Sequence, residues 1–265
     1  MKSDIANTNI GKGIVLHPSM GMYGRFDREI DVMGGLSASV YAPAENPKDK
    51  YFFESMSADP AFIALINFGS GKQIVDIVRD TKYLGGFGVM LIDSVNQQNQ
   101  VELDRVTGQL KVIYSLNEQD KVRLRAGLTR GLEMLFNQGA HEVHLPTSEQ
   151  LLSLKKGYVP FSSKEQVASG VAKLKFIENL NVISSAHMQS SNKMGDSPEN
   201  AVVSKNFKVW DQSTGREIDN LYVCDSSIFP TSVGANPMQS IYTFAKLFVD
   251  KHIQEEQQKN LKAKL

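Results

Sequence analysis

The chain has 265 residues, of which 41% are hydrophobic and 22% are charged, the composition of an ordinary folded protein. Its 29 basic and 29 acidic side chains give a formal net charge of zero, so no overall field favours nucleic acid or an anionic membrane. The N-terminus has no apolar segment of signal-peptide length, and no run approaches the roughly 18 apolar residues of a membrane span. The sequence therefore predicts a soluble, cytoplasmic protein.

Residues that bind metals are sparse. Cys224 is the only cysteine, so it forms no internal disulfide and belongs to no C-x-x-C zinc pair. His141 and His144 lie in a strand-like segment, where a spacing of three places two side chains on opposite faces. We therefore expect no metal site.

The first half of the chain predicts strands, then two helices, then strands again. Residues 10–57 alternate β-branched and aromatic residues with Gly and Pro, as strands joined by loops do. Asp59-Pro60 opens an apolar stretch, and helical spacing continues through 70–84 to a close at Gly85-Gly86. A strand at 88–95 and a hairpin at 100–116, bent at Thr107-Gly108, follow.

The second half begins with a strong amphipathic helix. Asn117 suits its N-cap, and it ends near Gly139. Its predicted apolar face comprises Val122, Leu124, Leu128, Leu132 and Leu135. The remaining predictions are strands at 142–146, 181–186 (buried), 206–210 and 220–225, and helices over 164–179 and from Pro237. Strands and helices mix without regular alternation, which predicts an α+β fold with a largely antiparallel sheet flanked by helices.

Two runs combine residue types suited to chemistry: SSAHMQSSNKMG at 184–195, and the longer run at 220–250. In the second, the apolar strand LYVC delivers Asp225 at its C-terminal end, where a carboxylate can accept hydrogen bonds from ligand hydroxyls. Asn236 suits an N-cap and Pro237 the first helical position, so free amides and the positive end of a helix dipole follow. Such a helix start stabilises an anionic group.

These runs resemble the C-terminal signature of the glucose-methanol-choline (GMC) oxidoreductases, which oxidise alcohols with FAD. The family's first block, roughly H-x-x-G-T-x-x-M-G, is matched by His187, Met194 and Gly195, with Ser190-Ser191 in place of Gly-Thr. The second, roughly N-L-Y-V-x-D-x-S-x-F-P-T-x-x-G-x-N-P-M, is matched at 220–238. Asparagine before the proline is similar to the long-chain alcohol oxidase and cholesterol oxidase-like branches.

The N-terminal run IGKGIVLHP resembles the family's I-G-x-N-L-x-x-H-P, with Gly13 in place of asparagine. The resemblance implies four parts: 1–16 from the middle of the flavin domain, 17–183 as substrate-binding domain, 184–252 as the catalytic and flavin-contacting segment, and a charged tail at 253–265. The strand, loop and helix of 184–252 would complete an FAD-binding domain.

The resemblance also implies roles. His187 would be the base that takes the alcohol proton while hydride leaves for the flavin, a task that suits a side chain titrating near neutrality. Asn236 would steady the substrate oxygen, with helix N-capping as its alternative role. Cofactor contacts would come from Asp225, Ser226, Gly234, Ala235, Pro237 and Met238.

The chain departs from the family because its sequence contains no G-x-G-x-x-G fingerprint. Its glycine pairs, at Gly69-Ser70-Gly71 and Gly11-Lys12-Gly13, do not complete the G-x-G-x-x-G fingerprint that lets backbone approach the FAD pyrophosphate. A separate FAD-binding chain is the expected partner. A split enzyme, a truncated inactive gene product and a recombinant fragment remain alternatives.

The leading functional prediction is the C-terminal portion of an FAD-dependent oxidoreductase acting on a small-molecule primary or secondary alcohol, including long-chain or sterol-like ones. The alternative is an inactive remnant or a non-catalytic interaction module, because a side chain at the family's glycine, here Ser190, could crowd the cofactor or bend the loop.

Overall fold

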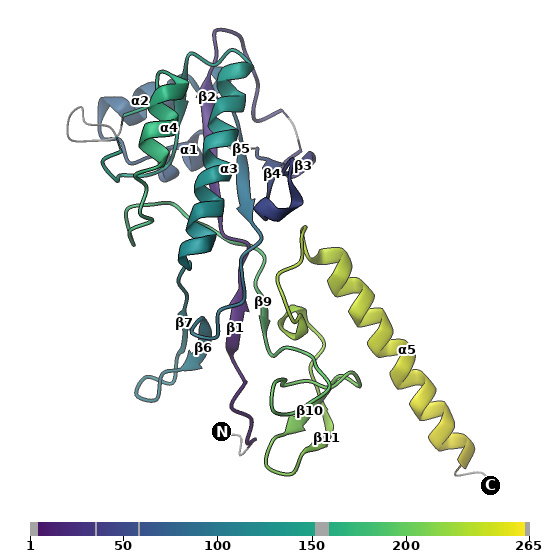
Figure 1. The fold of residues 1–265 in the computed structure, drawn as a ribbon. Helices are drawn as coiled ribbons and strands as arrows, with labels where there is room; N and C mark the ends of the chain where they lie inside the picture. Colours follow the sequence, from purple (N-terminus) through teal and green to yellow (C-terminus); the bar gives the residue numbers. More distant parts are fainter. Residues whose placement is uncertain (1–4, 35, 58, 152–158, 263–265) are drawn as a thin grey trace. The chain divides into compact units, whose positions relative to one another are not determined.

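The computed structural model describes residues 5–262 except 35, 58 and 152–158. The chain divides into two compact units (Figure 1). Unit 1 comprises residues 1–16, 93–115 and 186–265, and unit 2 comprises 17–92 and 116–185. Both contain antiparallel strands and helices, which confirms the predicted α+β class. Among the described residues no helix is long and apolar enough to cross a bilayer.

The sheet of unit 2 has five antiparallel strands in the order β3-β4-β5-β2-β8. They are β2 (Ser19–Arg25), β3 (Tyr41–Pro43), β4 (Tyr51–Ser55), β5 (Leu84–Leu91) and β8 (Glu142–His144). Its helices are α1 (Pro60–Ile66), α2 (Lys72–Arg79), α3 (Glu118–Asn137) and α4 (Lys164–Val171), with short turns at Pro47–Asp49 and Thr81–Tyr83. Helix α3 lies along the sheet beside β2 and β5 (Figure 1).

Helix α3 approaches the sheet closely because it has glycines where it meets the strands. A Cβ on Gly127 would lie 2.6 Å from Val89, and one on Gly131 would lie 2.4 Å from the Met22 sulfur. The Asn117 side chain accepts a hydrogen bond from the Asp120 amide at 2.8 Å, which confirms the predicted N-cap. Of the predicted apolar face all but Val122, which is 53% exposed, are buried. This contact forms the main core of unit 2.

Three predicted elements of unit 2 were wrong. Helix α2 ends at Arg79, and the two glycines expected to close it lie within β5, where a Cβ on Gly86 would meet the Met22 carbonyl at 2.2 Å. Helix α4 ends at Val171 instead of 179, because the next amides, of Lys173 and Leu174, bond three residues back in tight turns, and positive φ at Phe176 and Asn179 prevents the helix from resuming. Residues 181–186 make only isolated bridges and are half-buried or exposed, so they are not a buried strand.

Unit 1 is built on a four-stranded antiparallel sheet in the order β7-β6-β1-β9, with a separate β10-β11 hairpin. The strands are β1 (Lys12–Val15), β6 (Gln100–Leu103), β7 (Leu110–Ile113), β9 (Gln189–Ser191), β10 (Lys208–Asp211) and β11 (Arg216–Tyr222). Residues 93–115 fall within the 17–183 domain that the family resemblance implies. They belong to unit 1, because β6 pairs with β1.

A second apolar core holds unit 1 together. Its buried members are Val202, Val203, Phe207, Val209, Ile228 and Phe229. The 3-10 turn η3 (Ser226–Ile228) contributes to it, and helix α5 (Met238–Lys262) packs on it through Ile241, Phe244 and Phe248. Helix α5 begins one residue later than predicted, because the Ile241 amide donates to the Pro237 carbonyl at 2.9 Å and Pro237 thereby takes the capping position.

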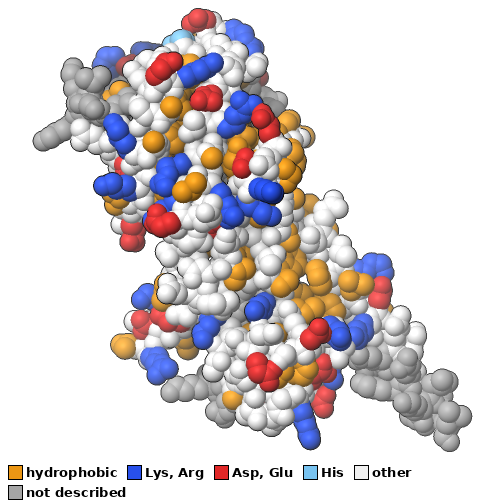
Figure 2. Space-filling model, in the orientation of Figure 1, with side chains coloured by type: hydrophobic (Ala, Val, Ile, Leu, Met, Phe, Trp, Pro, Cys, Tyr) orange, Lys and Arg blue, Asp and Glu red, His pale blue; other side chains and the backbone are white. Residues whose placement is uncertain are grey.

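The surface matches the neutral net charge. On the face drawn in Figure 2, acidic and basic side chains are scattered among apolar ones, and neither sign gathers into one patch. Nothing on this face indicates a polyanionic partner.

A buried polar cluster lies on β2 and β8 of unit 2. The His144 side chain is 3% exposed, its ring stacks on Tyr23 at 4.5 Å, and its Nε2 lies 3.0 Å from a Glu142 carboxylate oxygen. Arg25 donates to the same oxygen at 2.7 Å. Burial lowers the pKa of His144, while the hydrogen bond with His144, together with Arg25, lowers the pKa of Glu142 to about 2.

These shifts predict a loss of stability in acid. Because the pKa of folded His144 lies below its unfolded value of 6.5, the unfolded state takes up the proton more readily, and the free energy of unfolding falls as pH drops below about 6.5. Urea titrations at pH 7, 6 and 5 measure this fall. His144→Gln should flatten it, whereas His141→Gln, a change at a 46% exposed side chain, should leave it intact. An identical fall in His144→Gln would contradict the assignment.

Candidate functional site

The two signature runs meet in unit 1. The Asn192 amide donates to the Ser227 carbonyl at 2.9 Å, and the Met194 amide donates to the Ile228 carbonyl at 2.7 Å. The N-terminal run joins them, because β1 pairs with β9 at Lys12–Ser191. Three segments distant in the sequence, each singled out for its resemblance to the same family, therefore form one local structure.

His187 lies two residues before β9 and is half-buried. The side chain of Gln189, 1% exposed, donates to the His187 carbonyl at 3.1 Å and accepts from the Val233 amide at 3.0 Å. The Ser226 hydroxyl donates to the Met188 carbonyl at 2.8 Å. The histidine segment is thus joined to η3 through Ser226 and to the middle of the loop between η3 and α5 through Val233.

That loop has a further attachment at Asp93, a 4% exposed carboxylate. One Asp93 oxygen accepts from the Ser232 hydroxyl at 3.0 Å. The other accepts from the Leu16 amide at 2.9 Å and the Tyr114 hydroxyl at 2.7 Å. Neither Gln189 nor Asp93 was a sequence candidate, although Asp93 lies in the predicted strand at 88–95 and Gln189 in the run at 184–195.

The last residues of the loop form an exposed surface that could contact a negatively charged ligand. Gly234, Ala235 and Asn236 are exposed and lie immediately before the long helix α5, whose N-terminal amides and dipole favour negative charge. Asp225 is exposed too, and one of its carboxylate oxygens accepts from the Ser227 amide at 2.7 Å. Among the described residues its other oxygen has no hydrogen-bond partner, and it could accept from a ligand hydroxyl.

The residues present fit part of FAD. The exposed turn and carboxylate suit the isoalloxazine and hydroxylated portions, whereas the glycine fingerprint for the pyrophosphate is absent from the sequence. Of the predicted cofactor contacts, Met238 is 56% exposed, Pro237 is buried and Ser226 already donates its hydroxyl proton to Met188. The contacts with FAD stay predictions.

The serine that replaces the family's glycine is conformationally strained. Ser190 has φ of 65° and its neighbour Ser191 has φ of 84°, the left-handed region that favours glycine. Ser190 is 2% exposed, and its hydroxyl has no hydrogen-bond partner among the described residues. A glycine at this position would avoid both costs.

We therefore predict that Ser190→Gly stabilises the chain. Relief of the left-handed conformation and removal of a buried unpaired hydroxyl outweigh the added entropy of the unfolded chain, and the net gain is about 1–3 kcal/mol in free energy of unfolding. Urea unfolding measures it. As a control, Ser169→Gly on the exposed face of α4 should destabilise by about 0.5 kcal/mol. A loss of stability in Ser190→Gly would contradict the strain.

The comparisons with known proteins agree with these motifs. The family model of the GMC oxidoreductase C-terminal domain matches residues 95–245. Two long-chain-alcohol oxidases of Arabidopsis thaliana, FAO3 and FAO4B, are 28% and 27% identical over 92% and 98% of this chain. The chain spans only about a third of these relatives, 33% and 34% of their lengths.

Solved structures show the same fold. A formate oxidase of Aspergillus oryzae aligns with a TM-score of 0.59 at 13% identity, over 95% of this chain and 48% of that one. An FAD-dependent oxidoreductase of Chaetomium thermophilum aligns with a TM-score of 0.53 at 13% identity, over 95% and 49%. Because the family model matches more than half of this chain, the chain belongs to the FAD-dependent GMC oxidoreductases and corresponds to their C-terminal half.

Proposed function

We propose that this chain is the substrate-facing, proton-transferring portion of an FAD-dependent alcohol oxidoreductase. The observation that carries the proposal is the joining of the His187 segment to the 233–236 loop by the buried Gln189 side chain, which brings the backbones of the two candidate catalytic segments together. The Arabidopsis relatives, named long-chain-alcohol oxidases, support an alcohol with a long chain as the substrate.

Each candidate residue has a task in such a reaction. FAD, when bound, supplies the hydride acceptor. The imidazole of His187 takes the proton from the alcohol oxygen, and the hydrogen bond from the Gln189 side chain to the His187 carbonyl fixes the backbone that carries that ring. The side chain of Asn236 donates to the same oxygen. The N-terminal amides of α5 stabilise negative charge that develops next to the helix start.

The flavin-binding portion must come from outside these 265 residues. Helix α5 presents an exposed apolar stripe of Met238, Tyr242, Val249 and Ile253, which share one helical face. We propose that a separate flavin-binding chain covers this stripe. We also propose the cytoplasm as the location, because the lone Cys224 suits a reducing compartment.

An inactive remnant is the second candidate, and the strain at Ser190 favours it. A left-handed serine in the block that holds the base is what relaxed selection on the glycine would leave. The two candidates differ in whether the histidine matters for turnover.

We expect the purified chain to be colourless, and its co-expression with a flavin-binding chain that carries G-x-G-x-x-G to give a yellow complex whose absorbance bleaches when alcohol is added without oxygen. His187→Gln should keep FAD bound while slowing bleaching by about 10²–10⁴-fold. The control, His141→Gln, changes an exposed histidine of unit 2 and should bleach at the original rate.

Three outcomes would contradict the proposal. Stoichiometric FAD in the chain alone would show that no partner is needed. A yellow complex that bleaches as fast in His187→Gln as in the parent would remove the base from the mechanism, and a complex that never bleaches would favour the remnant.

A further inference from the structure

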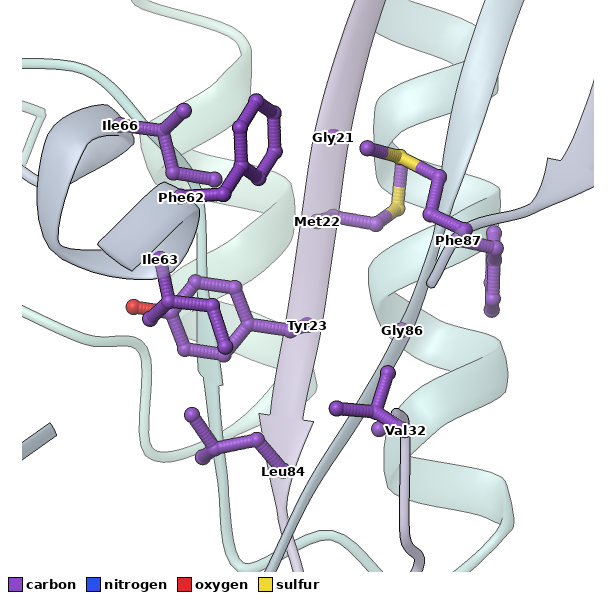
Figure 3. A pocket seen from close by; sticks show the side chains of 12 residues that line it. Gly21, Met22, Tyr23, Val32, Phe62, Ile63, Ile66, Leu84, Gly86 and Phe87 are labelled. Atoms are coloured by element: carbon purple, nitrogen blue, oxygen red, sulfur yellow. The ribbon is translucent and has the colours of Figure 1, made fainter. Parts of the chain in front are cut away.

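Unit 2 contains a cavity between helix α3 and the β3-β4 hairpin. Its volume is about 360 Å³, within the range of small-molecule sites in proteins. Tyr51 and Phe53 of β4 line it from the sheet, and Arg130 and Met134 line it from α3. The crevice between α1 and β2 in Figure 3 has a volume of about 30 Å³, room for only one or two water molecules. Of the two, the cavity beside α3 is the one that can hold a ligand.

Tyr51 places a polar group in this cavity. The residue is 7% exposed, and its ring lies against α3, where a Cβ on Gly127 would sit 3.1 Å from the ring Cγ. Among the described residues its hydroxyl has no hydrogen-bond partner. Burial raises the pKa of Tyr51, and the nearby Asp49 carboxylate raises it further, so the hydroxyl stays protonated at neutral pH. A buried hydroxyl without a protein partner can bond a ligand in the cavity that it lines.

The rim of the cavity is acidic. Its charged groups are the carboxylates of Glu45 and Asp49 and the guanidinium of Arg130, two negative charges and one positive. Arg130 donates to Glu45, whereas the Asp49 carboxylate has no ion-pair or hydrogen-bond partner among the described residues. Lys48 and Lys50 flank Asp49 in the chain but do not line the cavity. A positively charged nitrogen on a ligand would supply the partner that Asp49 lacks.

The cavity continues into an apolar extension. A second cavity of about 260 Å³ shares Ala42, Phe53 and Met134 with the first and adds Val40 and Phe87. The rings of Phe53 and Phe87 meet edge to face with their centroids 5.4 Å apart. A hydrocarbon group attached to the charged nitrogen would be removed from water along these side chains.

We propose that this cavity binds a primary ammonium ion that carries a hydrocarbon tail. The ammonium group donates to the Asp49 carboxylate and to the Tyr51 hydroxyl oxygen, and the tail lies along Phe53 and Met134. The ligand is not the alcohol of the proposed function, and every residue of the site belongs to unit 2. The proposal therefore does not rest on the proposed function.

Isothermal titration calorimetry of the full chain with propyl-, butyl- and hexylammonium tests the proposal without flavin. Affinity should rise about fourfold for each added methylene that is buried. Asp49→Asn should weaken hexylammonium binding at least tenfold, because the neutral amide no longer offsets the ligand charge. Tyr51→Phe should weaken it about fivefold through the loss of one hydrogen bond. The matched control, Asp27→Asn, changes a 95% exposed carboxylate of the same unit and should bind as the parent does.

Circular dichroism and thermal unfolding verify that each variant is folded, and if one of the two cavity variants does not fold, the other decides the result. Equal affinity for hexylammonium in the parent and in the folded cavity variants would overturn the site, as would no saturable binding to the parent. Binding of 1-hexanol or hexanoate as tight as that of hexylammonium would show a groove without preference for a cation and would overturn the proposal too. Failure of the flavin complex to bleach with alcohol would overturn only the proposed function.

Discussion

The buried side chain of Gln189 is the interaction on which the candidate site depends. Its side-chain nitrogen donates to the His187 carbonyl, and its side-chain oxygen accepts from the Val233 amide. One residue therefore satisfies backbone groups from both signature runs. A buried carboxamide left without such partners would cost about 1–3 kcal/mol, so the two segments and this side chain hold one another in place. The Asp93 carboxylate similarly accepts a hydrogen bond from Ser232, the residue before Val233.

The surroundings of this pair of segments follow from it. Strand β9 pairs with β1. The loop after η3 begins at the apolar core of unit 1, in which Ile228 and Phe229 are buried. The exposed turn at Gly234 to Asn236 is then available at the start of α5. Strain at Ser190 is tolerated because the bonds on either side of it fix the local backbone.

The sequence predicted what local patterns determine. Helix α3 was found because its cap and its 3.6-residue spacing lie within one segment, and the β6-β7 hairpin was found because its turn residues are adjacent. Residues 93–115 could not be assigned to their unit, because β6 pairs with β1 across almost ninety positions. The chain after α4 leaves the helical path through left-handed turns at Phe176 and Asn179, where neither residue is glycine.

The candidate site divides in the same way. His187, Asn236 and Asp225 stood in matched motifs, whereas nothing local distinguishes Gln189 from other glutamines; only the fold shows both of its partners. Hydrogen exchange of the Val233 amide in Gln189→Leu tests whether the Gln189 side chain holds the loop against the His187 segment. We expect exchange at least tenfold faster than in the parent chain, with the core amide of Leu128 unchanged. Equal exchange at Val233 in the two proteins would contradict it.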